Sequence, residues 1–241
     1  MDKISIITIT FNNAQGLEQT IKSVCLQDYA EKEFIVIDGD SKDDTPTVCK
    51  RYADCIDVCV SEPDEGIYDA LNKGIRRASG KWIICMNAGD VFASNDVLQR
   101  IFAEGVPASK RFIYSDSIIE YASGRQLLRV MDRSKGNVFH QSAIYERTLH
   151  DEYGYYVVTN PYTVSDLMFF LAVPEKYYYK TDILISKASF GGASSQGLWC
   201  PRSAMALRVA YRMESIHKAY FKYLVMVLKS KVKRLLGIRQ K

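Results

Sequence analysis

The chain has 241 residues, of which 47% are hydrophobic and 25% charged, so it is large enough to bury a substantial core. Its length suits one large domain, or one domain with an appendage. The net charge of +4 conceals an asymmetry: residues 200–241 carry eleven Lys/Arg and one acid, whereas residues 1–199 carry 21 Lys/Arg and 27 acids. An acidic body with a basic tail indicates two separate tasks.

The first residues and the cysteines bear on the compartment. Met1-Asp2-Lys3 leads directly into the β-branched segment Ile4–Thr10, which predicts a first strand and no signal peptide. The six cysteines are scattered and show no zinc-finger spacing; they are Cys25, Cys49, Cys55, Cys59, Cys85 and Cys200. We therefore expect a cytoplasmic protein whose cysteines are reduced, structural thiols.

Strands and helices alternate through the first third of the chain. Strands are expected at 4–10, 34–37, 56–60 and 82–86, and helices at 17–26, from Thr45 (as cap, with Pro46 in the first position) and at 67–78. This βαβαβαβ order predicts a mostly parallel sheet with helices on both faces.

After Asp90 the order is less regular. We expect a helix at 95–103, a strand at 112–115, a hairpin of 118–121 with 126–130, a strand at 137–139 and a helix at 166–173. Residues 190–195 are a Gly/Ser-rich loop. Because no linker interrupts residues 1–200, we treat them as one domain with halves at 1–95 and 96–200, followed by a basic tail at 201–241.

From Ser203 the chain has no Pro or Gly before Gly237, which predicts one long helix. On a helical wheel its lysines form one narrow wedge, and apolar side chains fall on the opposite side: Lys218, Lys222, Lys229 and Lys233 against Tyr220, Leu224, Leu228, Val232 and Leu235. The apolar run Tyr223–Leu228 is too short to span a bilayer. Residues 211–236 could lie on an anionic membrane surface or pack back onto the sheet.

Polar side chains follow each of the first four expected strands: Asn12, then Asp38 and Asp40, then Glu62 and Asp64, then Asp90. Each alone is an ordinary turn residue, but the carboxyl ends of parallel strands share one edge, where ligands bind. No Gly-x-Gly-x-x-Gly or phosphate-loop motif is present, and nothing indicates nucleic-acid binding. The edge could hold a nucleotide through Asp38, with Mg²⁺ or Mn²⁺ at Asp90 neutralising a diphosphate.

Val36–Thr45 (VIDGDSKDDT) resembles the VVDGGSxDGT segment of family 2 glycosyltransferases. Ser61–Gly74 and Asn87–Asp90 are similar to one branch, the colanic-acid type enzymes of bacterial exopolysaccharide and O-antigen assembly. The resemblance is close over residues 3–95 and continues through His140-Gln141, Ser165-Asp166 and Gly191–Ser194. It implies a GT-A fold: a Rossmann-like, mostly parallel central sheet with helices on both faces, here followed by C-terminal amphipathic helices.

The resemblance also implies roles on the nucleotide side. Thr8, Thr10 and Asn12 would line the nucleotide site, Asp38 would contact the base or ribose, and Asp64 would be a second acid on that side.

Further roles follow for the metal and the acceptor. Asp90 corresponds to the last acid of an Asp-x-Asp metal motif, and Asp166 to the general base of an inverting transfer. Asn87 stands where the motif has an acid, which leaves a neutral carbonyl ligand, and Ser165 replaces the usual Glu. His140 either contacts phosphate or acceptor, or is a hydrogen-bonded structural residue.

These features predict a metal-dependent inverting glycosyltransferase that uses a nucleotide-diphospho sugar, UDP-linked, and a saccharide acceptor on a lipid carrier. It would work at the cytoplasmic face of a bacterial membrane. The alternative is a catalytically silent GT-A domain that binds nucleotide or sugar and scaffolds an assembly complex. A nucleotidyltransferase should open with a glycine-rich basic loop after the first strand, and Phe11-Asn12-Asn13-Ala14 is not such a loop.

Overall fold

The computed structural model describes residues 2–121, 123–159, 163–189 and 199–235. At its centre, β1 (Ile4–Thr10) pairs in parallel with β2 (Lys32–Asp38) on one side and with β4 (Trp82–Cys85) on the other. The complete sheet also contains β3 (Val58–Ser61), β6 (Phe112–Tyr114), β9 (Ala143–Glu146) and β10 (Tyr178–Lys180), in the order β10-β6-β9-β4-β1-β2-β3. Only β9 runs antiparallel to its neighbours, so the prediction of a mostly parallel sheet is confirmed.

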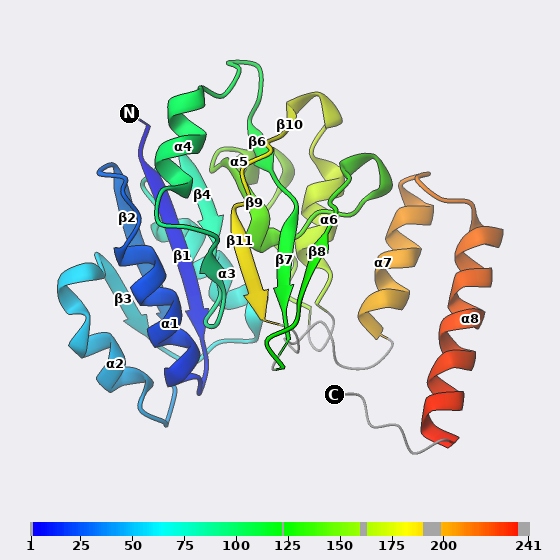
Figure 1. The fold of residues 1–241 in the computed structure, drawn as a ribbon, viewed down its shortest axis with the longest axis horizontal. Helices are drawn as coiled ribbons and strands as arrows, with labels where there is room; N and C mark the ends of the chain where they lie inside the picture. Colours follow the sequence, from blue (N-terminus) through cyan, green and yellow to red (C-terminus); the bar gives the residue numbers. More distant parts are fainter. Residues whose placement is uncertain (1, 122, 160–162, 190–198, 236–241) are drawn as a thin grey trace.

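Helices cover both faces of this sheet (Figure 1). Side chains alternate along each strand, so Ile6 and Ile84 pack on one face and Ile7 and Ile83 on the other. The first face carries α1 (Ala14–Cys25), α2 (Thr45–Arg51) and α4 (Val97–Glu104), and the second carries α3 (Ile67–Arg77), α5 (Leu149–Tyr153) and α6 (Ser165–Ala172). Thr45 lies inside α2 rather than capping it, because Asp44 precedes the helix and Asp43 accepts from the Thr45 amide at 3.0 Å.

A second sheet of short strands flanks the first. It contains β5 (Val91–Phe92), β11 (Ser186–Ser189), β7 (Ser117–Glu120) and β8 (Gln126–Arg129) in that order, and β7 with β8 is the predicted hairpin. The expected strand at 137–139 is wrong: Asn137 forms an isolated bridge with Asp132. Short 3₁₀ turns, η2 (Arg133–Lys135) and η3 (His140–Ser142), lie on either side of these residues, and two others occur elsewhere, η1 (Ala53–Cys55) and η4 (Glu175–Tyr177). The predicted Gly/Ser-rich loop at 190–195 lies outside the described residues.

The C-terminal segment forms two helices, α7 (Trp199–Ala210) and α8 (Ile216–Leu235), so the prediction of one uninterrupted helix is wrong. Arg212 adopts a left-handed backbone (φ 57°), and Met213 N–H donates to the Arg208 carbonyl at 2.8 Å, which closes α7. The Ser215 hydroxyl then accepts from Lys218 N–H at 3.3 Å and begins α8. Met213 also packs against Gly136 of the body, which fixes the turn.

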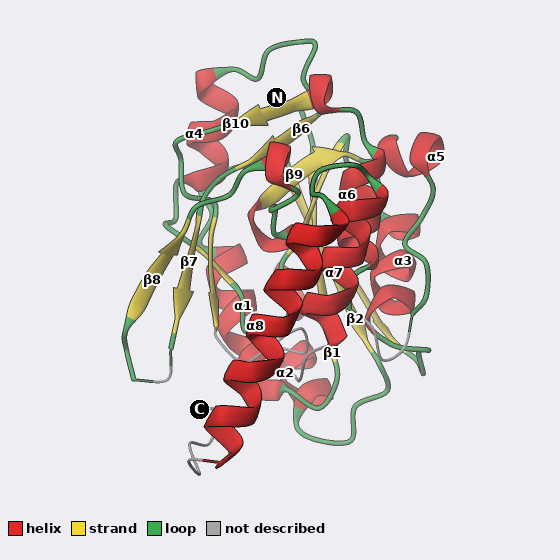
Figure 2. Cartoon of the chain, turned by 90° about the vertical axis from the view of Figure 1, so that its right-hand side faces the viewer, coloured by secondary structure: helices red, strands yellow, loops and turns green. Residues whose placement is uncertain are grey.

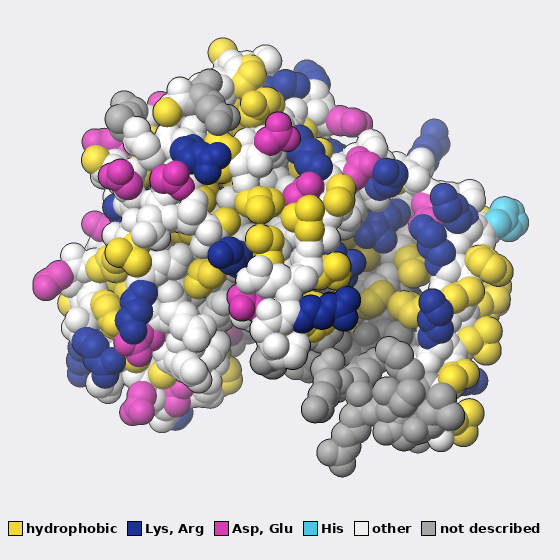
Figure 3. All heavy atoms as spheres, viewed as in Figure 1, with side chains coloured by type: hydrophobic (Ala, Val, Ile, Leu, Met, Phe, Trp, Pro, Cys, Tyr) yellow, Lys and Arg dark blue, Asp and Glu magenta, His cyan; other side chains and the backbone are white. Residues whose placement is uncertain are grey.

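Helix α8 packs against α7 and lies outermost, with α7 between it and the body (Figures 1 and 2). The buried Ala219 and the half-buried Tyr223 mark its inner face. Its outer face exposes a row of large apolar side chains: Tyr220, Phe221, Leu224, Leu228, Val232 and Leu235. Figure 3 shows this apolar band beside lysines and arginines. Neither α8 nor any other helix in the described part of the chain is long and apolar enough to cross a membrane.

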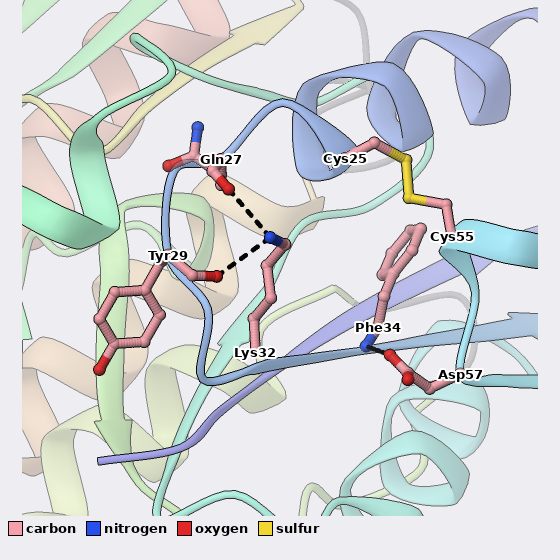
Figure 4. The surroundings of a disulfide bond; sticks show 7 residues. All are labelled: Cys25, Gln27, Tyr29, Lys32, Phe34, Cys55 and Asp57. Carbon is pink, nitrogen blue, oxygen red and sulfur yellow. Dashed lines mark hydrogen bonds between the residues drawn. A yellow bond between two sulfur atoms is a disulfide. The ribbon is translucent and has the colours of Figure 1, made fainter. Parts of the chain in front are cut away.

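One expectation about the cysteines is wrong, because Cys25 at the end of α1 and Cys55 at the end of η1 form a disulfide (Figure 4). Their Cα atoms are 6.1 Å apart, within the range that a disulfide bridges. The adjoining segments are tied by other bonds: Asp57 accepts from Phe34 N–H at 2.7 Å, and Lys32 Nζ donates to two carbonyls of the α1–β2 loop. Cys49, Cys59, Cys85 and Cys200 are free.

A buried carboxylate joins three segments at the opposite edge of the sheet from the strand carboxyl ends. Glu33 on β2 accepts hydrogen bonds from the Ser5 hydroxyl, from Ser79 N–H at 2.5 Å and from Gly80 N–H at 3.1 Å. Lys3 Nζ lies 2.8 Å from its other oxygen. Burial opposes ionisation of Glu33, but the bonds from Lys3, Ser5 and Ser79 outweigh it and lower its pKa to about 2.

Glu33→Gln should therefore destabilise the fold without touching the strand carboxyl ends. Because the folded-state pKa is lowered from 4.5 to about 2, ionised Glu33 contributes about 3 kcal/mol above pH 4.5. That contribution is lost as pH falls from about 4.5 towards 2. Urea unfolding at pH 7 should show this loss, and the gap to wild type should narrow in acid; Glu31→Gln, which alters an exposed carboxylate nearby, is the control. An equal effect of both substitutions would contradict the assignment.

Candidate functional site

The first strand supplies two of the predicted nucleotide-site residues, and both are buried. Thr8 lies within β1, fully buried, and its hydroxyl donates to the Met86 carbonyl at 2.6 Å, which joins the ends of β1 and β4. Thr10 is the last residue of β1, and its hydroxyl finds no partner among the described residues. The free hydroxyl of Thr10 is therefore available to a ligand at this edge, whereas Thr8 supports the edge from beneath.

Asp38 ends β2 directly beside Thr10, with only 1% of its surface exposed. Its carboxylate accepts from the Ser61 hydroxyl at 2.6 Å and from the amide and hydroxyl of Ser41. These bonds fasten the ends of β2 and β3 and the loop after β2 to one side chain. The sequence analysis assigned no role to Ser41 or Ser61, although both lie in segments that resemble the family.

Asn12 shapes the rim above Asp38. Its backbone is left-handed (φ 48°), a conformation that Asn tolerates better than most residues. Its Oδ1 accepts from Lys42 N–H at 2.8 Å, and its own N–H donates to the Ser41 hydroxyl at 2.7 Å. Asn12 thus holds the loops after β1 and β2 together.

Asp64 reaches the same rim from the loop after β3. One carboxylate oxygen accepts from Gly66 N–H at 2.8 Å, while the other faces Gly39, where an added Cβ would lie only 2.5 Å from it. Glycine at position 39 therefore permits Asp38 and Asp64 to sit side by side. The structure brings Thr10, Asn12, Asp38 and Asp64 together at the carboxyl ends of β1, β2 and β3.

Asp90 lies further along the same edge, in the turn after β4. Its backbone is tied at both ends: Asp90 N–H donates to the Asn87 carbonyl and the Thr20 hydroxyl donates to the Asp90 carbonyl, each at 2.8 Å. Burial raises the pKa of its carboxyl to about 6, only partly offset by the positive potential of His140 and a bond from Gln141. A buried carboxylate whose ionisation is opposed in this way is stabilised by a cation placed beside it.

The donor atoms around Asp90 fit a divalent metal. Asn87 Oδ1 is buried and finds no partner among the described residues, so it offers a neutral oxygen close to the Asp90 turn. In the described part of the chain, no three His, Cys, Asp or Glu side chains converge to form a metal site by themselves. Mg²⁺ and Mn²⁺ with one or two protein oxygens take their remaining ligands from phosphates and water. A metal here would therefore depend on a phosphorylated ligand.

Asp166 extends the site on the α3 and α6 side of the sheet. Its Oδ1 accepts from the Tyr68 hydroxyl at 2.8 Å, and its Oδ2 lies 3.2 Å from His140 Nδ1. Burial alone would raise the pKa of Asp166, but the bond and charge of His140 and the bond from Tyr68 lower it below the ordinary value. The side chain is 20% exposed, so one edge of the carboxylate remains open.

The structure answers whether Asp166 merely caps α6. The helix begins after Val164, no side chain caps it, and Asp166 lies in its first turn. The carboxylate points to Tyr68 and His140, from α3 and η3. Asp166 is therefore a half-buried carboxylate built into a polar cluster.

His140 connects the two parts of the edge. Its Nε2 lies 3.0 Å from Asn87 Nδ2, and its Nδ1 faces Asp166. Burial would lower the pKa of His140, but the charges of Asp166 and Asp90 and the Asp166 hydrogen bond raise it. The roles of Tyr68 and Gln141 were not predicted from the sequence. Tyr68 lies in a segment that resembles the family, but its contact with Asp166 could not be predicted.

The family model for "Glycosyl transferase family 2" matches residues 5–159. The chain belongs to this family. Its relatives include an uncharacterised glycosyltransferase of Mycobacterium tuberculosis, 43% identical over 96 residues, which are 39% of this chain and 37% of that protein. A PGL/p-HBAD biosynthesis glycosyltransferase of Mycobacterium bovis is 30% identical over 161 residues, 63% of this chain and 62% of that protein. The chain thus spans less than two thirds of the length of these relatives.

Solved structures with the same architecture have low sequence identity. S. aureus TarS 1–349, crystallised with UDP-GlcNAc, superposes with a TM-score of 0.70 at 16% identity, over 87% of this chain and 65% of that one. The mannosyltransferase PcManGT from Pyrobaculum calidifontis, with GDP-Man and Mn²⁺, gives 0.61 at 16% identity, over 91% and 64%. These likenesses confirm the predicted GT-A fold.

Proposed function

We propose that this family 2 protein is an inverting glycosyltransferase that moves a sugar from a nucleotide-diphospho sugar, UDP-linked, to a saccharide acceptor. The observation that carries the proposal is the placement of Asp166 and Asp90 in one cluster, joined through His140 and Asn87. Asp166 is held ionised and is partly exposed, whereas Asp90 is buried and would be stabilised by a cation. Inverting transfer needs both functions at neighbouring positions.

Each of the site residues would have a separate role in the transfer. Thr10, Asn12, Asp38 and Asp64 would hold the nucleoside end of the donor at the β1–β3 edge. A divalent ion at Asp90 would supply positive charge to the departing diphosphate. Asp166, on the far side of the sugar, would accept the proton of the acceptor hydroxyl as the new bond forms. The UDP-GlcNAc and GDP-Man named for TarS and PcManGT support a nucleotide-sugar donor.

The acceptor we propose is a saccharide on a lipid carrier, in surface polysaccharide assembly of the colanic-acid type. The PGL/p-HBAD biosynthesis glycosyltransferases among the relatives support a role in a biosynthetic pathway. The exposed apolar band of α8 and its neighbouring lysines support a site of action on the cytoplasmic membrane surface. The alternative, in which residues 211–236 pack back onto the sheet, has less support, because α7 lies between α8 and the sheet (Figures 1 and 2).

The metal assignment predicts how UDP binds. UDP should bind with Mn²⁺ present and lose most of its affinity in EDTA, because the diphosphate then faces Asp90 without a bridging cation. Asp90→Ala should lose the same metal-dependent part of the affinity. Isothermal calorimetry measures both, and Asp96→Ala, which removes an exposed carboxylate from a neighbouring loop, should behave as wild type. Equal affinity with and without metal would contradict the metal site.

The base assignment predicts the effect of Asp166→Asn. Asn preserves the shape of the side chain and one of its two acceptor oxygens, so it can still accept from Tyr68, but it cannot take up a proton. Turnover should fall roughly 10²–10⁴-fold, while melting temperature and UDP affinity stay nearly unchanged. Donor consumption is measured with UDP-GlcNAc, UDP-glucose and GDP-mannose, with Asp151→Asn in the first turn of α5 as the control. Near-normal turnover would remove Asp166 as the base. No turnover by wild type on any donor, with UDP still bound, would favour the silent scaffold.

The tail predicts binding to anionic vesicles. Vesicles of phosphatidylglycerol and phosphatidylcholine should bind the full chain at low salt and release it as salt rises, because ions screen the lysine charges. Leu224→Gln/Leu228→Gln should weaken binding at every salt concentration, whereas Lys218→Gln/Lys229→Gln should chiefly flatten the salt dependence. Co-sedimentation measures both. Binding that neither pair of substitutions alters would show that α8 is not the contact.

A further inference from the structure

The proposed mechanism assigns no role to the hydrogen-bond partners around Asp166. Tyr68 from α3 and His140 from η3 both contact the Asp166 side chain of α6, and Asn87 from the turn after β4 contacts the far side of the His140 ring. Neither oxygen of Asp166 is left without a donor. We propose that Tyr68 and His140 are positioning residues that hold the Asp166 carboxylate in one orientation, and that Asn87 fixes the ring of His140. The inference rests on the proposed function.

Tyr68 is built to hold its hydroxyl in place. Only 3% of the residue is exposed, and its ring packs against Tyr156 with centroids 5.6 Å apart. Burial and the charge of Asp166 raise the pKa of Tyr68, so the hydroxyl keeps its proton and remains a donor. The hydroxyl reaches Asp166 Oδ1 at 2.8 Å. A rigid ring thus sets the position of one carboxylate oxygen.

His140 contacts the other oxygen of Asp166, and Asn87 determines which tautomer the His140 ring adopts. A carboxylate can only accept, so the nitrogen facing Asp166, Nδ1, carries a proton. In the neutral ring Nε2 is then an acceptor, which matches the amide N–H of Asn87 at 3.0 Å. An aspartate at position 87, as the metal motif of the family has, offers no donor to this nitrogen. Asn87 therefore has a task on the acceptor side that an acid could not perform.

The consequence is a carboxylate with limited freedom. Tyr68 donates to one oxygen and His140 lies at the other, so two donors from different segments fix the plane of the carboxylate. A hydroxyl that approaches Asp166 therefore meets lone pairs held in one direction. Because reactions lose rate steeply when reacting groups are misplaced by about 1 Å, fixing this direction should increase turnover rather than donor binding.

A double-mutant cycle tests the role of Tyr68. Tyr68→Phe should lower kcat on the donor used for Asp166→Asn by roughly 10–10² fold, with KM and UDP affinity unchanged. Combined with Asp166→Asn it should cause little further loss, because Tyr68 acts only through that carboxylate. Tyr156→Phe is the matched control: it removes a hydroxyl from the adjoining ring, whose partner is Tyr145. Equal effects of Tyr68→Phe and Tyr156→Phe, or full losses that multiply with Asp166→Asn, would overturn the proposal.

A second measurement does not depend on turnover. At a pH above the raised pKa of His140, where the ring is neutral, ¹⁵N NMR of the labelled full chain, with the His140 signals assigned by their loss in His140→Gln, should show the ring proton on Nδ1 and an unprotonated Nε2. Asn87→Asp should place a proton on Nε2, because the carboxylate can only accept. A wild-type ring protonated at Nε2 would overturn the role of Asn87. If wild type turned over no donor, the proposed function would fail while this spectrum still decided the hydrogen-bond arrangement.

Discussion

The parallel pairing of β1 with β2 and β4 is the constraint on which the rest of the structure depends. Seven consecutive residues of β1 are in register with β2, and four are in register with β4. This pairing brings the carboxyl ends of β1, β2, β3 and β4 to one edge, and with them Thr10, Asp38, Asp64 and Asp90. Two buried hydroxyl bonds, Thr8 to Met86 and Ser61 to Asp38, lock neighbouring strand ends at the fixed spacing. The acids gather because the strands are parallel.

The position of His140 depends on β9, the one strand of the seven-stranded sheet that is antiparallel to its neighbours. Because β9 is antiparallel to β4, its first residue rather than its last lies at the carboxyl edge. The residues just before it, His140 and Gln141, are therefore delivered beside Asn87 and Asp90. Helix α6 then places Asp166 against His140 from the layer beneath. A fully parallel sheet would have put these residues at the opposite edge.

The sequence predicts the first half of the fold well because its signals are local. Continuous apolar runs, the turn residues after them and Gly66 before α3 each act within a few positions. The second half depends on contacts between distant residues: β9, β10 and β11 are three or four residues long, and only their pairing partners make them strands. The break between α7 and α8 was missed because no Gly or Pro marks it; Met213 packing on Gly136, 77 residues away, fixes it.

The candidate site likewise has features that the sequence predicts and features that depend on contacts between distant residues. Asp38 and Asp90 could be singled out from residue type and position after a strand, and Asp166 from the family resemblance. The bonds that give them their properties could not: Tyr68 and Asp166 are 98 residues apart, and Asn87 and His140 are 53 apart. Burial around Asp90, which raises its pKa to about 6, is likewise a property of the assembled layers. A sequence shows which groups are present, and packing determines which of them carry charge.

The Cys25–Cys55 bond has a further consequence for where the molecule is strong. It closes a ring of chain that contains all of β2 and α2, with Asp38 inside it and Asp90 and Asp166 outside. Closing a loop of this size lowers the conformational entropy of the unfolded chain, which raises the free energy of unfolding by about 3–4 kcal/mol. Because the bond acts by constraining the unfolded chain, a reducing environment would lower the free energy of unfolding of the sheet as a whole. Asp90 and Asp166, which lie outside the ring, would lose as much support as Asp38 within it, since β1 pairs with both β2 and β4.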